Sequence, residues 1–208
     1  MRENYMDCPD RERGQWIGDV SVQAPQIAYL LDKNALKLLR KAIFDFIQLR
    51  KGDRLVGNVP GDNFCELPGQ SLNAISEWGM IASYYAATQD RSVLELALEP
   101  SVNYLKLWQT DKDGMLLPRK GDWAWFDHLY NIDIPVLEHC WYYSALKFVR
   151  FMAVTLKKEE YLPFLDERIA AIEKHFDERF WKENTYSGMG FADDRANAMA
   201  VLSGLCPK

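Results

Sequence analysis

Apolar residues recur at helical spacing along most of the chain, and the helices that they predict come in pairs. In each pair the first helix is apolar on nearly every side, whereas the second has one apolar stripe opposite a charged face. A helix that is apolar all round is buried on every side, and an amphipathic helix lies at a surface. The pattern therefore predicts two concentric layers of helices, an inner ring and an outer ring. The predicted pairs cover residues 16–31 with 34–49, 71–88 with 92–109, and 136–156 with 159–181.

The details of these segments predict how the pairs are joined. Ser92 and Glu95 form a capping box that opens the helix at 92–109, and Pro100 interrupts it. The linkers after the outer helices are long, and long ordered loops are usually functional. A unit of about sixty residues is longer than the common helical solenoid repeats and favours a closed ring of hairpins. A solenoid is the alternative.

We therefore expect an all-α fold whose hairpins close into a toroid. Residues 1–208 would supply three hairpins and the start of a fourth, because a seventh helix begins at Arg195 and is cut off at Lys208. The loops before the inner helices would meet around one axis. The N-terminus carries no secretory signal and resembles a chain that begins inside a longer protein.

Composition excludes several classes of partner. The net charge of -5 argues against nucleic acid, which needs a basic face, and no apolar run is long enough to span a membrane. The four cysteines and three histidines are scattered, so neither a disulfide framework nor a metal site is expected. No cofactor is predicted.

The densest group of ionisable residues lies in a loop at residues 7–19, just before the first inner helix. It contains four carboxylates, and cleavage of a glycosidic bond needs one carboxylic acid to protonate the leaving oxygen and others to hold sugar hydroxyls. By composition alone, such a loop is more often a solvated turn. The carboxylates are Asp7, Asp10, Glu12 and Asp19.

The order of residues in this loop resembles the signature of the bacterial α-L-rhamnosidases, a family of six-hairpin glycosidases. The matching segments are Asp7-Cys8-Pro9, Arg11-Glu12-Arg13 and Trp16-Ile17-Gly18-Asp19. The resemblance implies that Glu12 is the general acid and that Asp7, Arg11 and Asp19 hold the hydroxyls of rhamnose. One departure is that Arg11 and Glu12 are adjacent, whereas the commonest form of the family has an acidic residue between them.

A weaker resemblance extends to a wall of aromatic and acidic residues. Trp78 on the second inner helix, and Asp122, Trp123 and Trp125 before the third, are similar to the family's sugar subsite. Rhamnose is a 6-deoxy sugar whose methyl group and apolar ring face favour stacking on indole. Trp78 is as compatible with core packing as with a subsite. We expect the loop at 7–19 to converge with Asp122 and Trp123 at one end of the helix array.

The resemblance also implies an (α/α)6 toroid of which about half is present, so that residues 1–208 would be a partial six-hairpin glycosidase catalytic domain. It further implies what these residues lack. The family inverts configuration with a second carboxylate, roughly 6.5–9.5 Å from the acid in enzymes of this mechanism, that activates water. That base lies in the later half of the barrel, and no residue here is assigned to it. We therefore expect a carbohydrate substrate, a rhamnosylated glycan or glycoside, but an inactive 208-residue piece. Its uncovered inner-helix faces would favour self-association.

Other readings of the sequence stay open. A different six-hairpin glycosidase would show the same helices, and a non-catalytic helical module could bind carbohydrate or protein. Asp193-Asp194-Arg195 faintly resembles the diphosphate-binding motif of terpene cyclases, but no second magnesium motif accompanies it.

Overall fold

The computed structural model describes residues 4–8, 10–61, 64–126 and 130–206, and within them helices dominate. The all-α prediction is confirmed, with one short antiparallel ladder in the last described linker. The elements are α1 (Ile17–Leu30), α2 (Lys33–Gln48), α3 (Pro68–Ala74), α4 (Met80–Thr88), α5 (Arg91–Lys106), α6 (Ile134–Leu156), η1 (Glu159–Tyr161), α7 (Leu162–Phe180), β1 (Trp181–Lys182), β2 (Thr185–Tyr186) and α8 (Asp194–Ser203).

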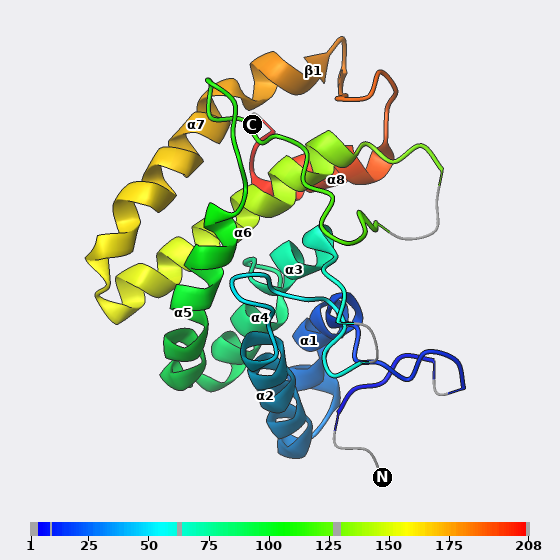
Figure 1. The fold of residues 1–208 in the computed structure, drawn as a ribbon, viewed down its shortest axis with the longest axis vertical. Coiled ribbons are helices and arrows are strands. Elements are labelled where there is room, and N and C mark those ends of the chain that lie inside the picture. The colour runs from blue at the N-terminus through cyan, green and yellow to red at the C-terminus, as the bar shows by residue number, and fades with distance from the viewer. Residues whose placement is uncertain (1–3, 9, 62–63, 127–129, 207–208) are drawn as a thin grey trace.

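The helices form hairpins arranged in two layers (Figure 1). α1, α3 with α4, α6 and α8 follow one another along the inner layer, where α1 contacts both α3 and α4, and α6 contacts both α3 and α8. α2, α5 and α7 lie outside them and pack against α1, α4 and α6 respectively. This arrangement matches the predicted alternation of buried and surface helices.

Aspartate side chains begin four of the described helices. Asp32, Asp90, Asp133 and Asp193 each accept a hydrogen bond from a backbone N–H in the first turn of α2, α5, α6 and α8. These N–H groups have no partner within the helix, so the carboxylate satisfies them. An acidic cap thus marks where each of these four helices starts.

The prediction of a continuous helix over residues 71–88 is wrong. The chain forms α3 and α4, separated by a turn at residues 75–79. Gly79 explains the break, because a Cβ atom there would lie 2.1 Å from the carbonyl oxygen of Asn73. Only glycine allows the backbone to approach itself so closely.

Two predictions about α5 are also wrong. Its N-cap is Asp90, whose carboxylate accepts hydrogen bonds from both the backbone N–H and the hydroxyl of Ser92, so Ser92 is not the capping residue. Pro100 does not end the helix, which continues to Lys106. Proline removes one backbone donor, and the packing of α5 against α2, α4 and α6 outweighs that loss.

α6 is the centre of the core. It contacts α3, α5, α7 and α8, and its long apolar sequence is buried by these neighbours. Trp108 at the end of the second hairpin packs against Tyr142 of α6, with ring centroids 5.5 Å apart and the ring planes tilted by 51°. Although α6 is long, no helix in the described part of the chain combines the length and apolar character of a membrane span.

The inner layer also presents large apolar side chains to solvent. They lie on α1, α6 and α8, at positions that the described hairpins do not cover: Val22, Tyr29, Leu30, Phe151, Val154, Val201 and Leu202. Large apolar side chains exposed in such numbers along one layer favour association with another surface.

Candidate active site

The N-terminal loop is positioned by its backbone. Asp7 N–H donates to the carbonyl oxygen of Gly14 at 2.9 Å, which closes the loop on itself. Gln15 N–H then donates to Pro60 and Ile17 N–H to Gly57, both at 2.8 Å, so the end of the loop runs beside residues 57–60. These bonds fasten the loop to the linker between α2 and α3 and bring it to the start of α1.

Two glycines allow this close approach. The buried side chain of Asn58 lies between Gly14 and Gly61, and Cβ atoms at those positions would lie 2.4 Å and 1.5 Å from its Oδ1 atom. A larger residue at either position would push the loop and the linker apart.

The loop gathers three carboxylates at the mouth of a cavity. Asp7 and Glu12 place their oxygens, together with the sulfur of Cys8, within 4.8 Å of one another. Glu12 also forms an ion pair with Arg11 at 2.6 Å, and its side chain is 34% exposed. Asp19 lies in the first turn of α1, where the helix dipole favours a negative charge.

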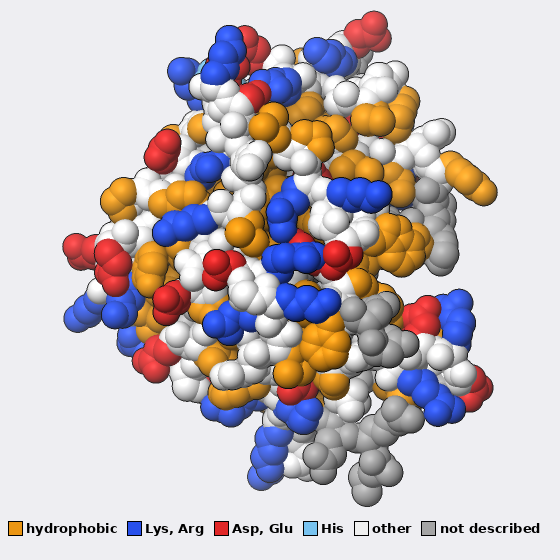
Figure 2. Space-filling model, viewed as in Figure 1, with side chains coloured by type: hydrophobic (Ala, Val, Ile, Leu, Met, Phe, Trp, Pro, Cys, Tyr) orange, Lys and Arg blue, Asp and Glu red, His pale blue; other side chains and the backbone are white. Residues whose placement is uncertain are grey.

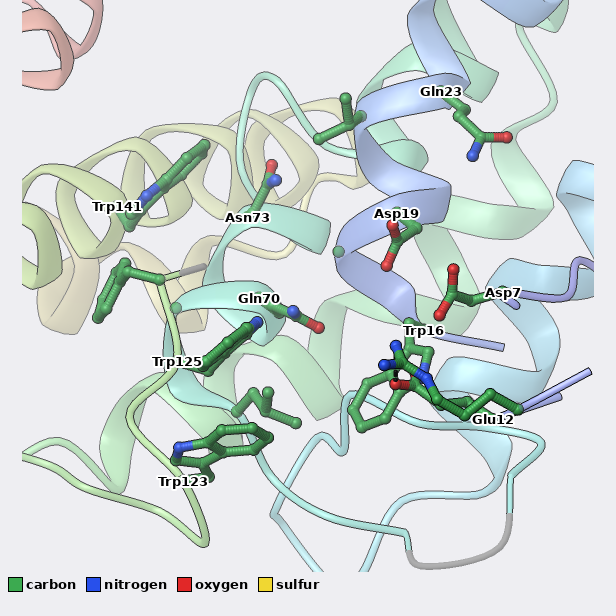
Figure 3. Close-up of a pocket in the computed structure, with 16 residues that line it drawn as sticks. Asp7, Glu12, Trp16, Asp19, Gln23, Gln70, Asn73, Trp123, Trp125 and Trp141 are labelled. Atoms are coloured by element: carbon green, nitrogen blue, oxygen red, sulfur yellow. Dashed lines mark ion pairs between the residues drawn. The ribbon is translucent and has the colours of Figure 1, made fainter. Parts of the chain in front are cut away.

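Tryptophans form the facing wall. Trp123 and Trp125 lie in the linker between α5 and α6 with ring centroids 4.4 Å apart, and Trp123 is 47% exposed. Phe126 follows them and packs over Gly69 of α3, where a Cβ atom would lie 2.7 Å from the Phe126 ring. The exposed indole faces are thus directed at the cavity from the side opposite the carboxylates (Figure 3).

The cavity between these walls has a volume of about 660 Å³, enough for a sugar ring and part of its neighbour. Figure 2 shows the surface hollowed at this place, with charged side chains of the N-terminal loop on one side of the notch and hydrophobic side chains on the other. The lining residues are Asp7, Arg11, Glu12, Trp16, Gly18, Asp19, Val22, Gln23, Leu67, Gly69, Gln70, Asn73, Trp123, Trp125, Phe126 and Trp141.

The structure therefore brings together Asp7, Arg11, Glu12 and Asp19 with Trp123 and Trp125. The other two candidates lie elsewhere. Trp78 is 46% exposed in the turn between α3 and α4, outside the cavity lining. The carboxylate of Asp122 forms an ion pair with Arg54 at 2.6 Å and accepts the backbone N–H of Glu66 at 2.8 Å.

Some lining residues were not predicted as site residues. Trp16 belongs to the loop signature and could have been named from it. Gln70 and Asn73 lie one turn apart on α3 and line the cavity beside Trp141 of α6 (Figure 3). No motif marks these three positions, and their role depends on how the helices are placed in space.

A buried carboxylate holds the tryptophan wall in place. Glu66 is fully buried and accepts hydrogen bonds from Arg54 at 2.7 Å, from Arg119 at 2.8 Å and from the hydroxyl of Tyr104 at 3.0 Å. Its backbone carbonyl also accepts the N–H of Trp123 at 3.2 Å. A buried carboxylate is stable only when it is paired and hydrogen-bonded, and Glu66 satisfies both conditions with groups that flank the tryptophans.

The linker between α5 and α6, which carries the tryptophans, is also held by a hydrogen bond to α6. Leu116 N–H donates to Nε2 of His139 at 2.9 Å, so the proton of this ring is on Nδ1, which donates to the carbonyl oxygen of Pro135. Burial lowers the pKa of His139 to about 4 and raises the pKa of the neighbouring Glu138 to about 8, although a hydrogen bond from the backbone of Arg119 to Glu138 opposes that rise.

The acidic sequence before α8 has a structural role. The buried Asp193 caps α8, accepts the backbone N–H of Asp133 at 2.9 Å, and pairs with Arg195 at 2.9 Å. A carboxylate that is buried and paired in this way is not placed to hold a magnesium diphosphate.

An array of helical hairpins that gathers carboxylates and tryptophans beyond the ends of its inner helices has the architecture of a hairpin glycosidase domain. The model of one family, the bacterial alpha-L-rhamnosidase 6 hairpin glycosidase domain, matches residues 1–208. The chain therefore belongs to this family. An alpha-L-rhamnosidase of Streptomyces avermitilis is 28% identical over 177 residues, in an alignment that covers 80% of this chain and 16% of the relative.

Solved structures show the same fold. A GH78 rhamnosidase of Bacillus sp. GL1 superposes with a TM-score of 0.81 at 18% identity, covering 100% of this chain and 23% of its own. The rhamnosidase of Klebsiella oxytoca with rhamnose bound gives 0.80 at 17% identity, covering 100% and 42%. The alpha-L-rhamnosidase from Dictyoglumus thermophilum gives 0.78 at 22% identity, covering 100% and 24%. The chain thus spans less than half the length of each of these relatives.

We predict that Glu66→Gln destabilises the protein by about 3 kcal/mol, because it leaves Arg119 without its charged partner in a site of low exposure. Urea unfolding measures this change. Asp166→Asn is the matched control, because it removes the exposed pair with Arg150 and should cost less than about 1 kcal/mol. Equal losses in the two variants would contradict the role given to Glu66.

We predict that Glu138→Gln makes the free energy of unfolding less sensitive to a rise in pH from about 4.5 to about 8. A carboxyl group whose pKa rises from 4.5 to about 8 on folding favours the folded state fully below pH 4.5, and this contribution is lost as the pH rises through 8. The wild type should therefore lose stability between these values relative to the variant. Unfolding of both proteins at pH 5 and pH 8 measures the difference, in which the opposite effect of His139 cancels. A constant difference would contradict burial of the acid form.

Proposed function

We propose that the cavity binds a terminal α-L-rhamnosyl group and that Glu12 protonates the glycosidic oxygen as the bond breaks. The observation that carries this proposal is the convergence of Asp7, Glu12 and Asp19 with the tryptophan wall on one cavity, in a chain that belongs to a rhamnosidase family. The relative from Klebsiella oxytoca, which was solved with rhamnose bound, supports the choice of sugar.

Each wall of the cavity suits one side of this sugar. The carboxylates of Asp7 and Asp19 accept hydrogen bonds from ring hydroxyls and stabilise the positive charge that develops in an oxocarbenium-like transition state. The indoles of Trp123 and Trp125 offer apolar faces to the C–H face and methyl group of a 6-deoxy sugar. Hydroxyls and apolar ring face are therefore bound from opposite directions.

Arg11 is the ion-pair partner of the proposed acid, Glu12. Its guanidinium pairs with Glu12 at 2.6 Å, and its side chain is 72% exposed. The ion pair with arginine holds Glu12 as a carboxylate, so Glu12 has to leave this guanidinium and take up a proton from solvent before it can protonate the glycosidic oxygen. Arg11 is then available to a sugar hydroxyl or to the aglycone, so it pairs with Glu12 before substrate binds and contacts substrate afterwards.

The reaction proceeds with inversion in this proposal. A second carboxylate on the opposite side of the sugar, roughly 6.5–9.5 Å from Glu12, activates the attacking water. It comes from hairpins outside residues 1–208, which would also cover the apolar faces of α1, α6 and α8. The 208-residue chain alone would bind the sugar weakly and would not hydrolyse the bond, which makes it a carbohydrate-binding module when it stands alone.

We predict that Glu12→Gln in the full-length protein slows hydrolysis of α-L-rhamnosides with poor leaving groups by roughly 10²–10⁴-fold, because it removes the transferable proton. Aryl rhamnosides with activated leaving groups need less protonation and should be slowed less. Steady-state kinetics on both substrate types measures the contrast.

The control for this experiment is Asp7→Asn, which disturbs binding and charge stabilisation and should slow both substrate types alike. If Glu12→Gln has the same effect on activated and unactivated substrates, or almost none, Glu12 is not the acid.

We also predict that purified residues 1–208 show no turnover of an aryl α-L-rhamnoside and self-associate as concentration rises, because large apolar side chains of the inner layer are exposed. Sedimentation velocity measures the association, and Leu202→Glu on α8 should weaken it. Lys37→Glu on the outer helix α2 is the control and should not. Clear turnover by the monomer would place the whole active site within this chain.

A further inference from the structure

The floor of the cavity contains a polar side chain that the fold does not use. Gln70 is the third residue of α3, and its amide points into the cavity between Trp125 and the carboxylates of Asp7 and Asp19 (Figure 3). It is therefore a polar group of α3 that lies between the two walls described above.

This side chain has no hydrogen bond to any residue that the structure describes, and its Oε1 atom is buried. Buried polar atoms in native proteins nearly always have a partner, and leaving one without a partner costs stability. An amide of this kind at a binding site indicates that its partner is a ligand.

The position of the amide is nevertheless well determined, by contact with two glycines. A Cβ atom at Gly18 of α1 would lie 2.6 Å from Cδ of Gln70, and one at Gly57 would lie 3.4 Å from Oε1. The amide thus occupies a slot between α1 and the linker before α3 that is open because two side chains are missing. Packing, and not hydrogen bonding, orients the amide.

We propose that Gln70 contacts the substrate, through a hydrogen bond between its amide and one hydroxyl of the bound sugar ring; this rests on the proposed function. Carboxylates such as Asp7 and Asp19 only accept hydrogen bonds, whereas an amide both donates and accepts, as a hydroxyl does. Gln70 therefore favours a sugar that has a hydroxyl at one particular position, and it does so without adding charge to a site that is already acidic.

The test uses Gln70→Met in the full-length protein, because methionine has almost the same length and shape but cannot form the hydrogen bond. Affinity for L-rhamnose should fall about tenfold, the usual worth of one such bond. Thermal stability should stay equal or rise, because a buried atom without a partner is removed. If Gln70 had a merely structural role, the Gln70→Met variant would be less stable than the wild type instead. Gln48→Met, at the exposed end of α2, is the matched control and should change neither property.

Monodeoxy derivatives of L-rhamnose identify the hydroxyl. One derivative should bind wild type and Gln70→Met equally, because the group that Gln70 contacts is already missing, while the others should show the tenfold difference. If Gln70→Met fails to fold, Gln70→Leu, which also can neither donate nor accept this hydrogen bond, should show the same pattern. Unchanged affinity for L-rhamnose, or the same loss for every derivative, overturns the proposal for Gln70. Failure of the wild type to bind L-rhamnose overturns the proposed function itself.

Discussion

The site depends on one buried carboxylate. Glu66 belongs to the linker that precedes α3, and it accepts hydrogen bonds from Arg54 of the same linker, from Tyr104 of α5 and from Arg119 of the linker that precedes α6. A buried charge requires this complete set of partners, and the partners come from segments far apart in the sequence. The free-energy cost of burying the carboxylate is therefore offset only when both linkers are in place. The tryptophan wall and the floor of the cavity are thus expected to form in the same folding step.

The layered fold explains why chemistry gathers at one place. Inner helices begin where long linkers end, so the N-terminal loop, the start of α3 and the linker before α6 lie beside one another. The outer helices α2, α5 and α7 shield the inner ones and contribute no lining residue to the cavity. The cavity is thus lined by linkers and by inner helices, whereas the outer helices take part only in packing.

The sequence predicted what depends on local pattern. Helical periodicity located the hairpins, and the signature at residues 7–19 located the carboxylates, because both are properties of neighbouring residues. The break at Gly79 was missed because its cause is a close approach to the backbone of Asn73, which no spacing rule reveals. The orientation of the Asp122 side chain was missed for a similar reason. Its carboxylate is held by Arg54 and by the backbone N–H of Glu66, which lie more than fifty residues earlier in the sequence. The cavity residues on α3 could be found only once the helices were placed.

The pairing of the N-terminal loop with residues 57–60 has a consequence for how members of such a family diverge. The location of Glu12 is determined by backbone contacts and by the two glycines around Asn58, not by its own neighbours in sequence. A change in the linker between α2 and α3, such as a one-residue insertion beside Asn58, would displace the carboxylates while leaving the signature intact. Two homologues with identical signatures can therefore differ in where these carboxylates lie, so the linker between α2 and α3 has to be compared as well as the motif.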